Sequence, residues 1–282
     1  MAERNRPSKV SAIAGLGEIA DRYDAILCDI WGVLHNGRAA FAAASEALVA
    51  YRRRGGAVVL ISNAPRPNPP IREQVLRFGT SPLAFDAVIT SGDVSIALIA
   101  ERIGEPVLHI GPARDLSLID AAAKAAGRQP RLVGLEDAAY ILCTGLYDDS
   151  VETPADYEDR LRAMAGRGLV MICANPDLVV HRGGDLLYCA GALASRFEEL
   201  GGAVVYAGKP HAPIYAGALA LAARARGVPL TKSRVLAIGD GMRTDIAGAS
   251  AAGIDALFVT QGIHRDGLHD GETAAVIPAL QP

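Results

Sequence analysis

Short runs of consecutive apolar residues recur along the chain, and longer segments with helical spacing separate most of them. Because apolar and polar residues do not alternate within these runs, the runs are typical of strands buried on both faces of a parallel sheet. The strand-like runs cover 25–31, 57–63, 86–90, 106–111, 138–145, 169–175, 203–208, 234–240 and 255–260. The helix-like segments cover 41–54, 92–103, 113–126, 190–200, 211–226 and 244–252. This alternation predicts an α/β fold with a parallel sheet covered by helices.

Two segments interrupt the alternation. The proline-dense stretch NAPRPNPP at 63–70 predicts a loop. Residues 1–24 contain acidic residues and no long apolar stretch, so they predict an amphipathic helix and not a signal peptide. No apolar run approaches the length of a membrane span, and a cytoplasmic protein is expected.

Composition narrows the class of protein. The chain has 282 residues, half of them hydrophobic, which is enough for a sizeable core with one inserted domain. The net charge of -3 argues against a broad basic surface for nucleic acid. The dense cationic cluster YRRRGG at 51–56 is interpreted as a solvated helix end. Four widely spaced cysteines form no CxxC pair, which argues against zinc or dithiol chemistry.

Polar residues follow many of the predicted strands. In open parallel sheets, ligands bind beyond the carboxyl ends of the strands, so these positions are candidates for a site. They are Asp29, Ser62, Asn63, Thr90, Ser91, Asn175, Lys209 and Asp240. A sheet without a site would more often end in ordinary turn residues.

Three carboxylates are the strongest candidates for chemistry. Asp240 ends a predicted strand, and Asp245 follows where the next helix begins. Together with Asp29 they would repel one another, and a hard cation such as Mg²⁺ would relieve the repulsion. Taken alone, Asp245 could be a helix N-cap. Taken alone, Lys209 could be a surface lysine, although a lysine after an apolar strand can also bind phosphate.

Four motifs in this order resemble those of the haloacid dehalogenase (HAD) superfamily. They are DIWGV at 29–33, ISNAP at 61–65, GKP at 208–210 and GDGMRTD at 239–245. The phrases SNAPRP, CANPD and AGKPH look most like its class IIA branch, which contains NagD-type, nitrophenyl and pyridoxal phosphatases. The resemblance implies a Rossmann-like, doubly wound core with an inserted smaller α/β cap of the C2 type. The expected core covers 1–104 and 184–282, and the expected cap covers 105–183.

The resemblance also implies roles for residues. Asp29 would be the nucleophile that forms an aspartyl-phosphate. Ser62 would hold the phosphoryl oxygens beside Asn63, and Lys209 would offset negative charge. The Mg²⁺ ligands would be Asp29, Asp240 and the carbonyl of Trp31, with Asp245 in direct contact or one step removed. Further expected contacts of the substrate are Gly32, His35, Asn63 and Asn175.

Trp31 departs from the family pattern. Phosphatases of the superfamily usually have a second aspartate at this position, which protonates the leaving group and then activates water. An indole cannot act as a general acid or base near neutral pH. Several explanations remain open: substrates with good leaving groups, substitution by His35, or a protein that binds phosphate with little turnover. A dehalogenase is a further alternative, because a halide needs no proton to leave, but dehalogenases of the superfamily do without Mg²⁺.

The sequence therefore predicts a Mg²⁺-dependent phosphatase of a small phosphorylated metabolite, such as a sugar phosphate or nucleotide. The main alternative is a catalytically weak protein that binds phosphorylated ligands. Neither nucleic acid nor membrane is an expected partner, and a homodimer is left open.

Overall fold

The structure is a computed structural model that describes residues 11–182, 185–260 and 274–277. The chain divides into two compact units. The first comprises Met1–Ser62, Pro69–Ile89 and Pro210–Pro282, and the second comprises Asn63–Asn68 and Thr90–Lys209. The chain thus passes between the units after residues 62, 68, 89 and 209.

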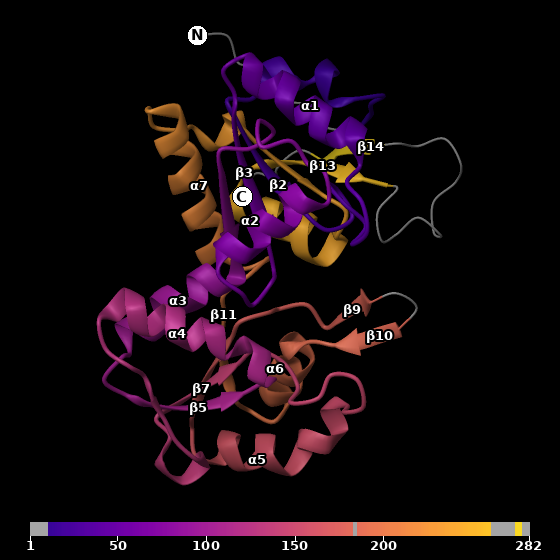
Figure 1. Ribbon diagram of the computed structural model, residues 1–282. Coiled ribbons are helices and arrows are strands. Elements are labelled where there is room, and N and C mark those ends of the chain that lie inside the picture. The colour runs from indigo at the N-terminus through magenta and orange to yellow at the C-terminus, as the bar shows by residue number, and fades with distance from the viewer. Residues whose placement is uncertain (1–10, 183–184, 261–273, 278–282) are drawn as a thin grey trace. The chain divides into compact units, whose positions relative to one another are not determined.

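The first unit is built on a seven-stranded sheet (Figure 1). The central strands β13, β12, β2 and β3 pair in parallel, whereas β14 pairs antiparallel with β13 and β1 antiparallel with β14. The order is β1 (Ser11–Ala12), β14 (Ala274–Ile277), β13 (Asp255–Val259), β12 (Val235–Gly239), β2 (Ala25–Asp29), β3 (Ala57–Ser62) and β4 (Ala87–Thr90). Every residue of β2 and β12 is buried, which explains their continuous apolar runs.

The helices of the first unit follow these strands. Helix α7 packs against β2 and β3, and a π-helical turn, η7, leads from β12 into α8. The helices are α1 (Ala42–Arg53), α2 (Asn68–Arg77), α7 (Ala212–Arg226), η7 (Met242–Ile246) and α8 (Ala247–Ala252). Three short 3-10 turns complete the described part: η1 (Leu16–Glu18), η2 (Ala20–Arg22) and η6 (Lys232–Arg234).

The second unit contains its own parallel sheet of five strands. Their order is β11 (Ala203–Tyr206), β8 (Val170–Cys173), β7 (Tyr140–Cys143), β5 (Pro106–Ile110) and β6 (Arg131–Leu132). A separate hairpin pairs β9 (Val179–Arg182) with β10 (Asp185–Tyr188). The helices are α3 (Ser91–Glu101), α4 (Leu116–Ala126), α5 (Glu158–Gly166) and α6 (Ala190–Glu199), with the short turns η3 (Ala113–Asp115), η4 (Leu135–Asp137) and η5 (Pro154–Tyr157).

Side chains of the second sheet alternate between two hydrophobic cores. Tyr140 and Leu142 of β7 point into a core shared with α3 and α4. Ile141 and Cys143 of the same strand point into a core shared with α5 and α6. Since both faces are covered, the strand needs apolar residues at every position. All four cysteines of the chain are buried and form no disulfide.

The α/β prediction is confirmed, and each of the nine apolar runs contains a strand. The boundaries of the two units differ from those expected, because α3, α6 and β11 belong to the second unit. Strand β11 pairs with β8, so the second sheet continues well beyond residue 183.

Two local predictions were wrong in part. The stretch 63–70 is not entirely a loop, because α2 begins at Asn68. The last two of its four prolines, Pro69 and Pro70, lie in the first turn of α2, where no intrahelical N–H bond is lost. Residues 11–24 form β1 and two short turns and not an amphipathic helix, and residues 1–10 lie outside the described part. Within the described residues, no helix is long and apolar enough to span a membrane.

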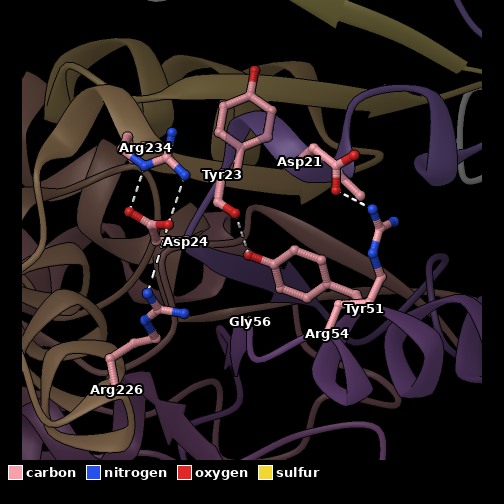
Figure 2. Close-up of a pocket in the computed structure, with 9 residues that line it drawn as sticks. Asp21, Tyr23, Asp24, Tyr51, Arg54, Gly56, Arg226 and Arg234 are labelled. Atoms are coloured by element: carbon pink, nitrogen blue, oxygen red, sulfur yellow. Dashed lines mark hydrogen bonds and ion pairs between the residues drawn. The ribbon is translucent and has the colours of Figure 1, made fainter.

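A cluster of ion pairs closes the amino end of the first sheet (Figure 2). Arg234 donates to Asp24 through two nitrogens, with Nη2 to Oδ1 at 2.7 Å, and Arg226 lies 3.6 Å from the same carboxylate. Arg226 also donates to the carbonyl of Gly55. Asp24, Arg226 and Arg234 line a cavity of about 140 Å³. The cluster joins the starts of β2 and β12 to the ends of α1 and α7. Arg54 pairs with Asp21, in agreement with a solvated helix end at 51–56.

Asp24→Asn is expected to lower the free energy of unfolding by about 1–3 kcal/mol, because Arg226 and Arg234 lose their shared counter-charge. Urea denaturation would measure the loss. The matched control is Asp21→Asn, which removes an exposed pair with Arg54 and should change stability little. Equal effects of the two substitutions would contradict a structural role for Asp24.

Candidate active site

Asp29 and Asp240 lie side by side at the carboxyl end of the first sheet. Asp29 is the last residue of β2, and Asp240 directly follows β12. The two strands are parallel neighbours, with Cys28 opposite Ile238. On its other side β2 pairs with β3, which ends at Ser62. The sheet edge predicted from the strand tips therefore brings these three residues onto adjacent strands.

Asp29, Asp240 and Asp245 form a compact carboxylate cluster. One carboxylate oxygen from each lies within 4.8 Å of the others, and the side chains are only 8%, 2% and 4% exposed. Buried carboxylates this close together repel one another when ionised. A hard divalent cation takes oxygen ligands of this kind and removes the repulsion, so the donor set fits such an ion.

Asp245 reaches the cluster from η7. Its Oδ2 accepts a hydrogen bond from the backbone N–H of Gly241 at 3.1 Å and another from the hydroxyl of Thr244 at 3.3 Å. The carboxylate therefore fixes the turn after β12 and also faces Asp29 and Asp240. The N-cap alternative is wrong, because Asp245 lies inside η7 and the N-cap positions of η7 and α8 are Gly241 and Ile246.

Gly32 passes directly against the cluster. Its φ of +81° lies in the left-handed region that favours glycine. A Cβ added at this position would lie 2.0 Å from Oδ2 of Asp240. The geometry requires Gly32 for a turn that leaves room for Asp240.

Trp31 follows Asp29 by two residues, and its indole is held in place although 44% exposed. The indole packs edge-on against His35, with ring centroids 5.2 Å apart. On another side it lies over Gly37, where an added Cβ would come within 2.4 Å of the ring. The indole can therefore take this position only because residue 37 is a glycine.

His35 is buried between two aromatic rings. Its imidazole meets Phe78 at 4.8 Å as well as Trp31, and Nδ1 accepts the N–H of Gly37 at 3.1 Å. Burial lowers the pKa of His35, and a backbone hydrogen bond opposes this effect. These surroundings favour a neutral imidazole that supports the indole of Trp31. They do not favour the role in proton transfer that the sequence suggested for His35.

Asn63, Asn175 and Lys209 lie in the second unit. Lys209 comes shortly after β11 and Asn175 shortly after β8, so both follow strands of the five-stranded sheet. The expected core contained Asn63 and Lys209, whereas the structure places both in the unit that contains Asn175. Asn63 and Lys209 are directly hydrogen-bonded, with the backbone N–H of Lys209 donating to Oδ1 of Asn63 at 2.7 Å.

Three further residues act on these groups from nearby. Thr244 holds Asp245, Gly37 makes room for Trp31, and Asp177 accepts a hydrogen bond from Asn63. Thr244 precedes Asp245 inside the motif GDGMRTD and could have been found there. Gly37 lies close to Trp31 in the chain, whereas the contact of Asp177 with Asn63, 114 residues apart, becomes visible only in the folded structure.

Comparison with known protein families supports the motif assignment. Residues 26–124 match a family described as haloacid dehalogenase-like hydrolase, and residues 206–281 match one described as HAD-hydrolase-like. No curated protein matches the chain.

Solved structures extend the similarity to nearly the whole chain. A haloacid dehalogenase-like family hydrolase from Brucella suis is 47% identical, with 88% of this chain and 89% of that chain covered and a TM-score of 0.81. A glycerol phosphate phosphatase from Mycobacterium tuberculosis, in complex with calcium, is 26% identical, with 87% and 68% covered and a TM-score of 0.66. NagD from Escherichia coli is 21% identical, with 91% and 94% covered and a TM-score of 0.63, which supports the class IIA fold. With its motifs in order and this likeness over most of its length, the chain belongs to the haloacid dehalogenase-like hydrolase family.

Proposed function

We propose that the protein is a Mg²⁺-dependent phosphatase that hydrolyses a small phosphorylated metabolite through an aspartyl-phosphate on Asp29. The observation that carries the proposal is the buried cluster of Asp29, Asp240 and Asp245 at the carboxyl end of the sheet. Structural relatives support it, because they include a glycerol phosphate phosphatase in complex with calcium and with magnesium.

In this mechanism a carboxylate oxygen of Asp29 attacks phosphorus. The bond from that oxygen to phosphorus forms as the bond from phosphorus to the leaving oxygen breaks. Water then hydrolyses the aspartyl-phosphate, which releases phosphate and restores the carboxylate. Ser62 and the backbone of Asn63 bind the phosphoryl oxygens, and Lys209 offsets their charge.

The metal would be held by Asp29, Asp240, Asp245 and the carbonyl of Trp31. When bound, Mg²⁺ neutralises charge that develops on the phosphoryl group. Gly32 contributes by letting the chain turn close to Asp240. The inserted cap, expected at about 105–183, would select the substrate.

The position of Trp31 limits the range of substrates. Without a carboxylic acid there, the leaving group departs as its conjugate base and takes a proton from solvent. We therefore propose that aryl and acyl phosphates react faster than alkyl phosphates. The test is hydrolysis of 4-nitrophenyl phosphate, acetyl phosphate and a panel of sugar phosphates with Mg²⁺ varied. Tight binding of these compounds without turnover would favour a phosphate-binding protein instead.

Asp240→Ala is expected to weaken Mg²⁺ binding by at least about tenfold, because a buried carboxylate ligand is lost. Isothermal titration calorimetry of the purified protein would measure the change. The control is Glu73→Ala, which removes an exposed carboxylate of α2 and should leave the affinity unaltered. An unchanged affinity in Asp240→Ala would argue against the assigned metal site.

A further inference from the structure

We propose that Asn63 is a positioning residue that orients Lys209. The inference rests on the proposed function, in which the ammonium group of Lys209 offsets the charge of phosphate and carboxylate. In this inference the side chain of Asn63 binds other residues of the protein, and only the backbone of Asn63 binds the substrate.

The side-chain amide of Asn63 is paired with both polar groups of one backbone residue. Its Oδ1 accepts the N–H of Lys209 at 2.7 Å, and its Nδ2 donates to the carbonyl oxygen of Lys209 at 3.1 Å. Both residues are buried, at 6% and 4% exposed. Two hydrogen bonds from one planar group fix the direction in which a backbone segment runs, and with it the start of the side chain.

A third hydrogen bond anchors the amide. Nδ2 of Asn63 also donates to Oδ1 of Asp177 at 2.9 Å. The backbone N–H of Asp177 in turn donates to Oδ1 of Asn175 at 3.1 Å, which holds the turn after β8. The network thus ties the chain at residue 63 and the chain after β11 to the end of a core strand.

Glycine backbones pack tightly around this network. A Cβ at Gly208 would lie 2.5 Å from Oδ1 of Asn63 and 2.8 Å from Cδ of Pro176. A Cβ at Gly191 would lie 2.2 Å from the carbonyl oxygen of Pro176. Little space remains for the segment before Lys209 to shift while the amide is in place.

Asn63 and Lys209 are also the residues at two of the unit boundaries in the chain, which lie after residues 62 and 209. Ser62 directly precedes Asn63 in the chain. One amide therefore controls the backbone beside a proposed phosphate-binding residue and the backbone of the proposed cationic residue. A displacement of about 1 Å in a catalytic group can cost roughly 100-fold in rate.

The test is a double-mutant cycle with Asn63→Ala and Lys209→Ala, measured as kcat/KM for 4-nitrophenyl phosphate at saturating Mg²⁺. Asn63→Ala should lower the rate by about 10- to 100-fold, and Lys209→Ala by at least as much. In the Lys209→Ala background, Asn63→Ala should have almost no further effect, because the group that it positions is gone.

Asn68→Ala is the matched control. Asn68 lies in the same unit, and its Nδ2 donates to Oδ1 of Asp93 at 3.1 Å. It is not part of the network that joins Asn63, Lys209 and Asp177. Its effect on rate should be the same with and without Lys209. Thermal unfolding of every variant separates loss of folded protein from loss of orientation.

If the Asn63→Ala variant does not fold, two substitutions of Asp177 test the same inference. Asp177→Ala removes the anchor of the amide, whereas Asp177→Asn keeps an acceptor oxygen, so the asparagine variant should retain more of the rate. The inference is overturned if the losses of the two single variants multiply in the double mutant, or if the two Asp177 variants have equal rates. Either result leaves the proposed role of Lys209 standing. A full rate in Lys209→Ala overturns the proposed role of Lys209 and, with it, the inference.

Discussion

Asp29→Asn should lower the rate of phosphate release by at least about 10⁴-fold while the protein remains folded, because an amide is nearly isosteric with the carboxylate but a poor nucleophile. Asp29 ends a fully buried strand next to β12, so the substitution changes the charge of the site and not its backbone. Turnover of 4-nitrophenyl phosphate and acid-quench trapping of the phosphorylated enzyme would measure the two consequences.

The control for this experiment is Asp21→Asn, an exposed carboxylate in the turn before β2 that should keep the full rate. Far-UV circular dichroism should match for both variants. An Asp29→Asn variant with most of the wild-type rate, or one that still accumulates a phosphorylated form, would remove Asp29 from the role of nucleophile.

Trp31→Asp should raise the hydrolysis of alkyl phosphates relative to aryl phosphates. Alkoxide departure depends on a proton, and a positioned general acid typically contributes roughly 100- to 10,000-fold. We expect a gain in the ratio of about 10- to 100-fold, because removal of the indole leaves a void against His35 and Gly37. The measurement is kcat/KM for one substrate of each class, and their ratio cancels any loss of folded protein.

Trp31→Phe is the matched variant, since it keeps an aromatic ring but adds no carboxylic acid. Its substrate ratio should stay close to that of the wild type. A flat or falling ratio in Trp31→Asp, with fold and Mg²⁺ binding preserved, would mean that position 31 does not approach the leaving group.

The sequence was sufficient to predict nine of the strands and the carboxylate cluster, but not β1, β6, β9, β10 and β14. Strands such as β2 and β12 are buried on both faces, so every position had to be apolar up to the residue at the tip. The charge that ends such a run, as at Asp29, is conspicuous for that reason. The spacing of Asp240 and Asp245 placed both on one strand-to-helix turn, as observed.

The assignment of strands to two sheets could not be predicted in the same way. Strand β11 has the same local pattern as β3, yet it pairs with β8 in the second unit. Its partner is chosen by packing between segments far apart in the chain, which a local pattern does not contain. For the same reason, the position of Lys209 and the pairing of Asn63 with Asp177 were outside the reach of sequence analysis.

The first unit is completed by residues from both ends of the chain. Asp24 and Arg234, which join the starts of β2 and β12, are 210 residues apart, while the strands of the second unit all lie between 106 and 206. During synthesis the second sheet has all its strands before β12 has been made. The carboxylate cluster is complete only after Asp245 has left the ribosome, because Asp245 is the last of its three members in the chain. A nascent chain that stops before Asp245 contains the proposed nucleophile but only part of the carboxylate cluster proposed to hold the metal.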